Sequence, residues 1–246
     1  MTNALITGAN KGIGFAAAGQ LGRSGVKVLV GARDPRKGTD AVELLRGQGV
    51  DAETVTIDVT DPASVSAAAA IVQKSHGHLD ILVNNAGVLP EVTAADRVGG
   101  PVDLQMFRDT FDTNVFGAVA VTEAFLPLLK AAPAARIVNV SSTMGSLADQ
   151  ADPESGYYGM VLPAYQTSKA ALNSMTIAWS KALADTPIKV NSVCPGWVKT
   201  DLGGPDNKAA APMTPDEGAS IITQLALIDA DGPTGGFFDR SGPVPW

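Results

Sequence analysis

Two side chains able to do chemistry, Tyr165 and Lys169, lie four positions apart in the stretch LPAYQTSKAALNSM. Residues four apart share one face of a helix, so the phenol and the ammonium group can point at the same place. A tyrosine has an ordinary pKa of about 10, which suits proton transfer at neutral pH poorly. A nearby cation favours the phenolate and lowers that pKa. The spacing therefore predicts a tyrosine that exchanges a proton, with Lys169 supplying the charge that makes it acidic.

Other groups that commonly move protons or bind metals are scarce or badly placed. His76 and His78 lie in SHGHL, at the expected exit of a helix, where a cation suits the helix C-terminus. The single cysteine, Cys194, excludes an internal disulfide and gives no thiolate cluster for a metal. We expect it to be a small buried side chain. A tyrosine–lysine pair alone is more often a solvated helix edge, so the prediction depends on the rest of the chain.

The stretch TGANKGIG, residues 7–14, directly follows the first predicted strand. Its glycines at 8, 12 and 14 permit a tight turn and let the backbone approach a ligand closely. The alanine-rich helix that follows presents free N–H groups and a partial positive charge to a phosphate. A strand before and a helix after such a loop are the context of a dinucleotide-binding site. We therefore expect a nucleotide phosphate at this loop.

Short β-rich runs alternate with longer helical stretches along the chain. Most runs are continuously apolar, as in parallel strands covered on both faces. Asp34-Pro35 and Asp61-Pro62 are helix-capping signals, and Thr214 with Glu217 predicts a capping box. The alternation predicts an α/β fold, a doubly wound (Rossmann) parallel sheet of about seven strands with helices on both faces. The predicted strands are 4–6, 26–30, 54–57, 79–83, 136–140, 189–193 and 236–238.

No repeat, low-complexity tract or linker divides the chain, so we expect one domain, 1–246, that both binds the dinucleotide and carries catalysis. Segments 89–102, 142–163 and 197–214 are expected to form substrate loops. Irregular stretches of this length in a compact domain are usually functional. Plain surface insertion is the alternative for the first two.

Together these motifs resemble the short-chain dehydrogenase/reductase family in its classical form. The resemblance covers essentially the whole chain, and the variants TGANKGIG, GARD, YxTSKAAL and CPGWVKTD are closest in motif to the carbonyl-reductase branch. The motifs occur in family order: the glycine loop, Asp58-Val59, NNAG at 84–87, Asn114, Ser141-Ser142, Tyr165 with Lys169, and Pro195-Gly196.

The resemblance implies an NADPH-dependent oxidoreductase that transfers hydride to a ketone or aldehyde carbonyl, with Tyr165 as the proton donor. Ser142, rather than Ser141, would hydrogen-bond the carbonyl and support the developing oxyanion. Asn114 would hold a water that links Lys169 to solvent. Lys169 would also bind the nicotinamide ribose. The implied catalytic residues are Asn114, Ser142, Tyr165 and Lys169.

The implied cofactor contacts run from the glycine loop to the turn after the sixth predicted strand. Asp58 would meet the adenine amino group, and Val198 and Thr200 the nicotinamide carboxamide. The full set is Gly8, Asn10, Lys11, Gly12, Ile13, Gly14, Arg33, Asp58, Val59, Asn85, Ala86, Gly87, Tyr165, Lys169, Pro195, Gly196, Val198 and Thr200.

The end of the second predicted strand, GARD, indicates which cofactor is preferred. In a nucleotide-binding βαβ unit, a carboxylate at this place binds the free ribose hydroxyls of NAD. Ala32 cannot do so, and the guanidinium of Arg33 can pair with a 2′-phosphate. Lys11 adds a second cation, and the capping role of Asp34 explains its presence. The sequence therefore predicts NADPH over NAD.

The formal net charge of −7 disfavours nucleic acid and anionic membranes as partners. No signal-type segment and no uninterrupted bilayer-length apolar run occurs, so we expect a cytoplasmic protein. The apolar character of the loops favours a small lipophilic carbonyl substrate. The loop residues behind this expectation are Met144, Leu147, Met160, Val161, Leu162 and Trp197.

The stretch from Ser142 to Tyr165 is longer than in most members of the family. It precedes the helix on which most relatives dimerise, and in the family larger insertions here accompany monomers. A homodimer is favoured by the resemblance, while a monomer stays open. Two other functions also stay open: a catalytically silent NADP-binding regulator, and a 3-oxoacyl-type reductase of the same family. The acidity of this chain argues against the second, since acyl carrier protein is acidic too.

Overall fold

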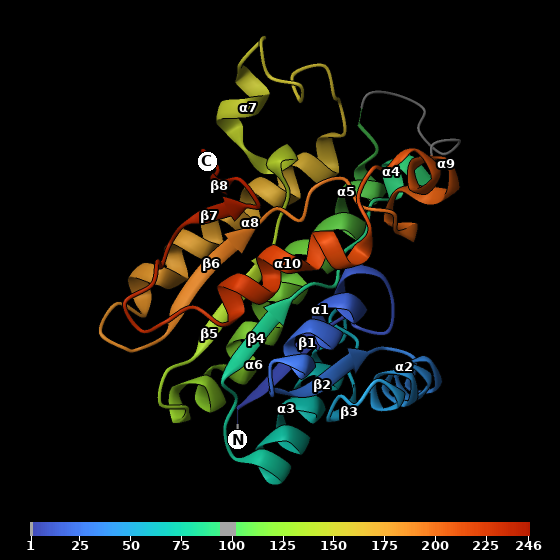
Figure 1. Ribbon diagram of the computed structural model, residues 1–246. Helices are drawn as coiled ribbons and strands as arrows, with labels where there is room; N and C mark the ends of the chain where they lie inside the picture. The colour runs from blue at the N-terminus through green and yellow to red at the C-terminus, as the bar shows by residue number, and fades with distance from the viewer. Residues whose placement is uncertain (1, 94–101) are drawn as a thin grey trace.

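The computed structural model describes residues 2–93 and 102–246, and its centre is one eight-stranded sheet in the order β3-β2-β1-β4-β5-β6-β7-β8 (Figure 1). Every neighbouring pair is parallel except β7 and β8. The strands are β1 (Asn3–Thr7), β2 (Lys27–Ala32), β3 (Ala52–Thr56), β4 (Ile81–Asn84), β5 (Arg136–Val140), β6 (Lys189–Val193), β7 (Phe237–Asp239) and β8 (Gly242–Pro243).

The predicted fold class is confirmed, and each of the seven predicted strands is present with its ends moved by a few residues at most. The eighth strand, β8, was not predicted. It has two residues and pairs antiparallel with β7 through Phe238 and Pro243. Two residues are too few to produce a periodic hydrophobic pattern, which is why this strand was not predicted.

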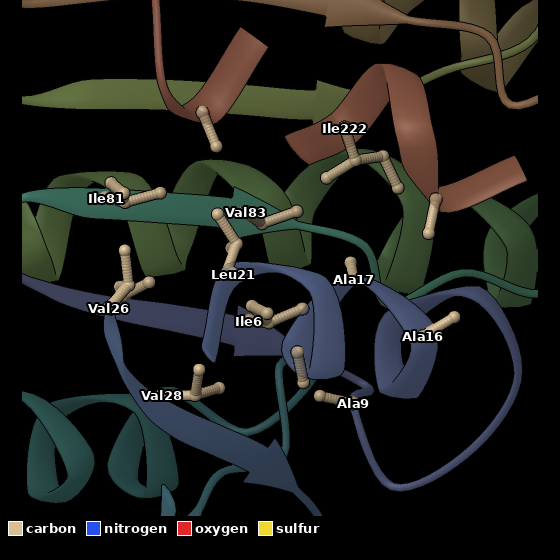
Figure 2. Close-up of a cluster of buried hydrophobic side chains, with 14 of the residues drawn as sticks. Ile6, Ala9, Ala16, Ala17, Leu21, Val26, Val28, Ile81, Val83 and Ile222 are labelled. Atoms are coloured by element: carbon tan, nitrogen blue, oxygen red, sulfur yellow. The ribbon is translucent and has the colours of Figure 1, made fainter. Parts of the chain in front are cut away.

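Helices cover both faces of the sheet (Figure 1). One apolar core lies between the sheet and the helices α1, α2 and α10, and a second lies between the sheet and α3, α6 and α8. Figure 2 shows the first core, where Ile6 of β1 and Val83 of β4 lie near Leu21 of α1 and Ile222 of α10. The six long helices are α1 (Gly12–Arg23), α2 (Pro35–Gly47), α3 (Pro62–His76), α6 (Ala118–Ala131), α8 (Pro163–Ala182) and α10 (Pro215–Ala226).

The predicted capping residues begin the helices they were assigned to. The Asp34 side chain accepts from the backbone N–H groups of Arg36 and Lys37, and that of Asp61 accepts from Ala63. Thr214 and Glu217 form the predicted capping box of α10. These caps start α2, α3 and α10 close to the carboxyl edge of the sheet, where a doubly wound fold holds its ligands.

A long continuous helical stretch, Leu104–Ala131, joins three elements: α5 (Leu104–Phe111), the π-helical η2 (Asp112–Gly117) and α6. By length and composition alone it is apolar enough to cross a bilayer, with a mean hydropathy of 1.3, and half of its most apolar window is buried inside the protein. A core helix has the same properties, and α6 packs its buried face against α3 and β4.

The predicted substrate loops contain short helices. Segment 89–102 contains α4 (Pro90–Thr93), and its residues 94–101 lie outside the described part of the chain. Segment 142–163 contains η3 (Thr143–Gly145) and α7 (Leu147–Ala151), and it rises above the sheet edge in Figure 1. Segment 197–214 contains η4 (Asp201–Gly203) and α9 (Gly204–Ala210).

Candidate active site

Tyr165 and Lys169 lie one turn apart near the start of α8, and both side chains are buried. The Lys169 Nζ atom is 5.5 Å from the centre of the Tyr165 ring. The same nitrogen donates a 2.8 Å hydrogen bond to the carbonyl oxygen of Val140, the last residue of β5. The pair therefore meets at the carboxyl edge of the sheet, and not on a solvated helix edge.

The pKa shifts of Tyr165 and Lys169 are set mainly by burial, which the prediction did not consider. Burial raises the pKa of Tyr165 above its ordinary value, the Cys194 side chain adds to the rise, and a hydrogen bond with Ser142 opposes it. Burial also lowers the pKa of Lys169 to about 8, against an opposing effect of Cys194. Burial thus opposes the acidity expected of the phenol, and Lys169 is not among the groups that lower its pKa. Packing of α8 removes both groups from water, and that disfavours both charged forms.

Ser142 is the second residue after β5 and is partly exposed, and its hydroxyl oxygen accepts a 3.2 Å hydrogen bond from the Met144 N–H. Ser141 is buried and donates to the carbonyl oxygen of Lys169 at 3.4 Å. The second serine of the pair is thus the one near the phenol, while the first anchors α8. Cys194 is buried, as expected, and accepts a 3.0 Å hydrogen bond from the Thr143 hydroxyl.

Asn114 lies in the π-helical segment η2, which the sequence predicted only as a helix. Its amide nitrogen donates to the Val88 carbonyl at 3.0 Å and to the Ser168 hydroxyl at 3.1 Å, and its oxygen accepts from the Val88 N–H at 2.8 Å. A Cβ added to Gly87 would lie 3.4 Å from the Asn114 oxygen and 3.8 Å from the Lys169 Nζ. Gly87, Asn114 and Lys169 therefore converge on one place. π-helical segments are frequent at functional sites.

The glycine loop has the geometry of a phosphate cradle. Gly8 and Gly12 have φ angles of +64° and +59°, which favour glycine. A Cβ at Gly14 would lie 2.5 Å from the Asn85 side-chain nitrogen and 2.8 Å from the Gly8 oxygen. Lys11 gives α1 no side-chain cap, so the first-turn N–H groups are available to a ligand.

The turn after β4 is fastened to this loop. The Asn85 side chain donates to the Thr7 carbonyl at 2.8 Å, and the Thr7 hydroxyl oxygen accepts from the N–H groups of Asn85 and Ala86, both at 3.0 Å. The adjacent Asn84 donates to the side chains of Thr122 and Asn139 inside the protein. Asn85, Ala86 and Gly87 thereby line one continuous edge with the glycine loop.

The two cations predicted to bind a 2′-phosphate differ in their surroundings. Arg33 is exposed at the end of β2 and close enough to Asp58 to lower the pKa of that carboxyl, after the larger effect of the Thr60 hydrogen bonds. Lys11 is paired with Asp201 beyond β6, at 2.9 Å. Asp201 also pairs with Lys208 at 2.8 Å, and the two lysines hold its pKa down at about 2. Lys11 is therefore not a free cation in this structure.

The turn after β6 bends back toward the glycine loop. Gly196 has a φ of +84°, and a Cβ there would lie 2.6 Å from the Met213 sulfur. Val198 is buried and forms a β-bridge with Met213. The Thr200 methyl group is 3.4 Å from where a Cβ of Gly12 would lie. Pro195 is buried at the start of this turn.

Three remaining predicted cofactor residues lie in the glycine loop, at the start of α1 and after β3. Asn10 is partly exposed in the glycine loop, and Ile13 packs against the core under α1, α2 and α10. Val59 packs against the other core, and a Cβ at Gly117 would lie 2.8 Å from its side chain. The structure leaves their cofactor contacts as predictions.

The sequence interpretation missed several residues that shape this site. Glu91 holds the start of α8 by accepting from the Tyr165 N–H. Ser168 holds Asn114 by accepting from its amide nitrogen. Thr7 holds the glycine loop to the turn after β4, since its carbonyl accepts from Asn85. Burial raises the pKa of the Tyr157 phenol, from segment 142–163, and the nearby Thr143 side chain opposes this rise. Thr7 had a usable signal, since it ends a strand and opens the glycine loop. The partner of Glu91 is far away in sequence, so no local pattern pointed to it.

The chain is similar in sequence to several known proteins. A family model described as short chain dehydrogenase matches residues 2–211. The (+)-neomenthol dehydrogenase of Capsicum annuum is 31% identical, with 96% of this chain and 95% of the relative covered. The carbonyl reductase [NADPH] 1 of Sus scrofa is 33% identical, with 99% and 93% covered.

A solved structure is also similar to this chain. The crystal structure of NADPH-bound carbonyl reductase from chicken fatty liver is 30% identical, covers 100% of this chain and 99% of its own, and has a TM-score of 0.83. The match extends over the three predicted substrate loops as well as the rest of the chain.

Proposed function

Because the chain belongs to the short-chain dehydrogenase family, we propose that it is an NADPH-dependent reductase of ketones or aldehydes in which Tyr165 donates the proton. Membership follows from the family match over 2–211 and from relatives above 30% identity over nearly the whole chain. The observation that carries the proposal is the meeting of Tyr165, Lys169 and Ser142 at the sheet edge that also holds the glycine cradle.

The chain's own residues supply positioning and a proton. The Ser142 hydroxyl, which lies near enough to the phenol to oppose the rise in its pKa, would donate to the substrate carbonyl oxygen and favour negative charge on it. When hydride reaches the carbonyl carbon, the Tyr165 O–H bond breaks and an O–H bond forms on the new alcohol. Lys169 holds the resulting phenolate, since its ammonium lies over the ring. A bound nicotinamide supplies the hydride.

The residues present fit a dinucleotide. A Cβ at Gly8 or Gly14 would crowd the turn after β4, so these glycines let the loop pack closely against that turn. The first-turn N–H groups of α1 have no side-chain cap and are available to a phosphate. The α1 N-terminus favours negative charge. NADPH is the proposed cofactor because Arg33 is exposed at the ribose end of β2 and the structural relative from chicken is NADPH-bound.

We infer a lipophilic carbonyl substrate from the loops around the site. Leu147, Met160, Val161 and Trp197 are all large apolar side chains, and each is about half exposed or more. Exposed apolar clusters of this kind mark ligand or partner sites. The net charge of −7 supports a protein that binds neither nucleic acid nor anionic membranes. We also propose a cytoplasmic location and a homodimer rather than a monomer.

The direct test is NADPH oxidation with a panel of ketones, aldehydes and quinones. Tyr165→Phe should lower kcat by about 10²-fold or more, because the donated proton is lost. The Kd for NADPH, measured by NADPH fluorescence, is the control. It should remain within about twofold of that of the unaltered protein. Turnover that survives Tyr165→Phe would contradict the tyrosine mechanism. NADPH binding with no turnover of any substrate in the panel would favour the silent regulator.

Cofactor preference is tested separately with Arg33→Ala. Loss of the guanidinium should raise the Kd for NADPH by about 10-fold and leave that for NADH nearly unchanged, because only NADPH carries the 2′-phosphate. Arg36→Ala, an exposed arginine in the first turn of α2, is the matched control. Tighter binding of NADH than NADPH by the unaltered protein would overturn the assignment.

A further inference from the structure

The N-terminus of the helix that carries Tyr165 is capped by a side chain from another part of the chain. One carboxylate oxygen of Glu91 accepts from the Ala164 N–H at 2.9 Å, and the other accepts from the Tyr165 N–H at 2.8 Å. The first N–H groups of a helix have no partner within the helix. Leu162, the N-cap residue, provides no side-chain bond, and Pro163 has no N–H. Glu91 therefore satisfies the donors that the local sequence leaves open.

Glu91 is held in place by its own short helix, α4. Leu89, just before it, is buried, and the Thr93 hydroxyl donates back to the Leu89 carbonyl at 3.3 Å. Val88 is fixed from the other side, since both its N–H and its carbonyl bond the Asn114 amide. The carboxylate is thus presented from a segment anchored at both the core and Asn114.

These contacts form a closed hydrogen-bond network around Tyr165. The Asn114 amide donates to the Ser168 hydroxyl, which donates to the carbonyl oxygen of Tyr165 at 2.8 Å. The Tyr165 N–H donates to Glu91, and the chain from Glu91 back to Val88 returns to Asn114. Both backbone polar groups of Tyr165 are therefore bonded to a network that includes Asn114.

We propose that Glu91 is a positioning residue that sets the place of the Tyr165 phenol by clamping the first turn of α8. This proposal rests on the proposed reductase function. It assigns Glu91 no contact with substrate or cofactor. A displacement of about 1 Å can lower a rate by about 10²-fold. Losing the contact that holds the backbone of the proton donor should therefore lower kcat.

The test compares three variants of Glu91 with one control in the full chain. Glu91→Ala should lower kcat by about 10-fold while the Kd for NADPH stays within about twofold. Glu91→Gln keeps the length and one acceptor and should recover most of kcat. Glu91→Asp is one methylene shorter, cannot reach both N–H groups, and should lose about threefold or more.

Glu123→Ala is the matched control, since Glu123 accepts a hydrogen bond from Trp179 near the other end of the same helix. It should leave kcat within about twofold. Equal losses in Glu91→Ala and Glu123→Ala would overturn the proposal, because they would show only a general need for a stable α8. A kcat unchanged in both Glu91→Ala and Glu91→Asp would also overturn it.

Hydrogen exchange separates this proposal from the proposed function. The amides of residues 164–170 should exchange faster in Glu91→Ala or Glu91→Asp than in the unaltered protein, and no faster in Glu123→Ala. This measurement needs no turnover, so it holds even if no reductase substrate is found. Unchanged exchange in residues 164–170 would overturn the proposal.

Discussion

At the scale of single residues, Tyr165 and Lys169 show how burial can outweigh a neighbouring charge. The spacing of four in YQTSK correctly placed the two groups on one helix face, since Nζ lies 5.5 Å from the ring centre. It could not give the direction of the phenol pKa, because desolvation depends on what α8 packs against. Residue types and spacing are local properties, whereas burial is a property of the assembled fold.

Lys169 should therefore destabilise the protein at neutral pH. Its pKa of about 8 in the folded chain lies below the ordinary 10.5, so below pH 8 the native state holds a buried charge that the unfolded chain keeps in water. Stability should rise with pH from about 8 toward 10.5 as the native lysine loses its proton first. Lys169→Met should stabilise the protein at pH 6 by about 1–3 kcal/mol and be nearly inactive.

Urea unfolding at pH 6 and at pH 9 measures this. The advantage of Lys169→Met should narrow at the higher pH, where the native lysine is mostly neutral. A difference that is the same at both pH values would show that the lysine is not titrating in the folded chain near 8.

At the scale of elements, the placement of α8 depends on a close contact with η3. A Cβ on Gly145 would lie 2.7 Å from both the backbone carbon and the Cβ of Lys169. No real side chain fits there, so the helix can approach the end of β5 only because residue 145 is glycine. This close approach brings Lys169 within reach of the Val140 carbonyl.

Gly145→Ala should push the two elements apart. We expect a loss of about 1–3 kcal/mol in the free energy of unfolding, together with a fall in kcat. Gly156→Ala is the control, because a Cβ there meets nothing within 4 Å, and its stability should change by less than about 0.5 kcal/mol. Chemical denaturation of both variants makes the comparison, and equal stabilities would contradict the close packing.

Elements differ in how far the sequence predicts them. The strands and the caps at Asp34, Asp61 and Thr214 were predictable because their signals lie within a few residues. The π-helical turn that holds Asn114 was not, since it depends on bonds to Val88 and Ser168 from other segments. The Glu91 cap of α8 has the same character.

At the scale of the whole molecule, segments from opposite halves of the chain meet over the glycine loop. Lys11 pairs with Asp201, which pairs in turn with Lys208, and all three side chains are about half exposed or more. Exposed pairs of this kind contribute about 1 kcal/mol or less and are weakened by salt. The contact is therefore easily broken when a ligand needs Lys11.

Asp201→Asn should tighten NADPH binding by about two- to fivefold at low salt, because the competing carboxylate is gone and Lys11 can turn to the phosphate. NADH should gain less. Asp206→Asn, an exposed carboxylate in α9, is the control. Titration by fluorescence measures both, and weaker NADPH binding by Asp201→Asn would show that the ion pair encloses the nucleotide and does not compete with it.

The Asp201 carboxylate acts, in effect, as a counterion that the protein carries for itself. A basic groove in water collects anions from the buffer, and these must leave when a nucleotide enters, which makes affinity fall steeply with ionic strength. Here the Lys11 ammonium is already paired with the Asp201 carboxylate of the same chain, so no buffer anion has to leave it when the nucleotide binds. The affinity of this chain for its dinucleotide should then decline less with rising salt than its number of basic residues near the groove would suggest.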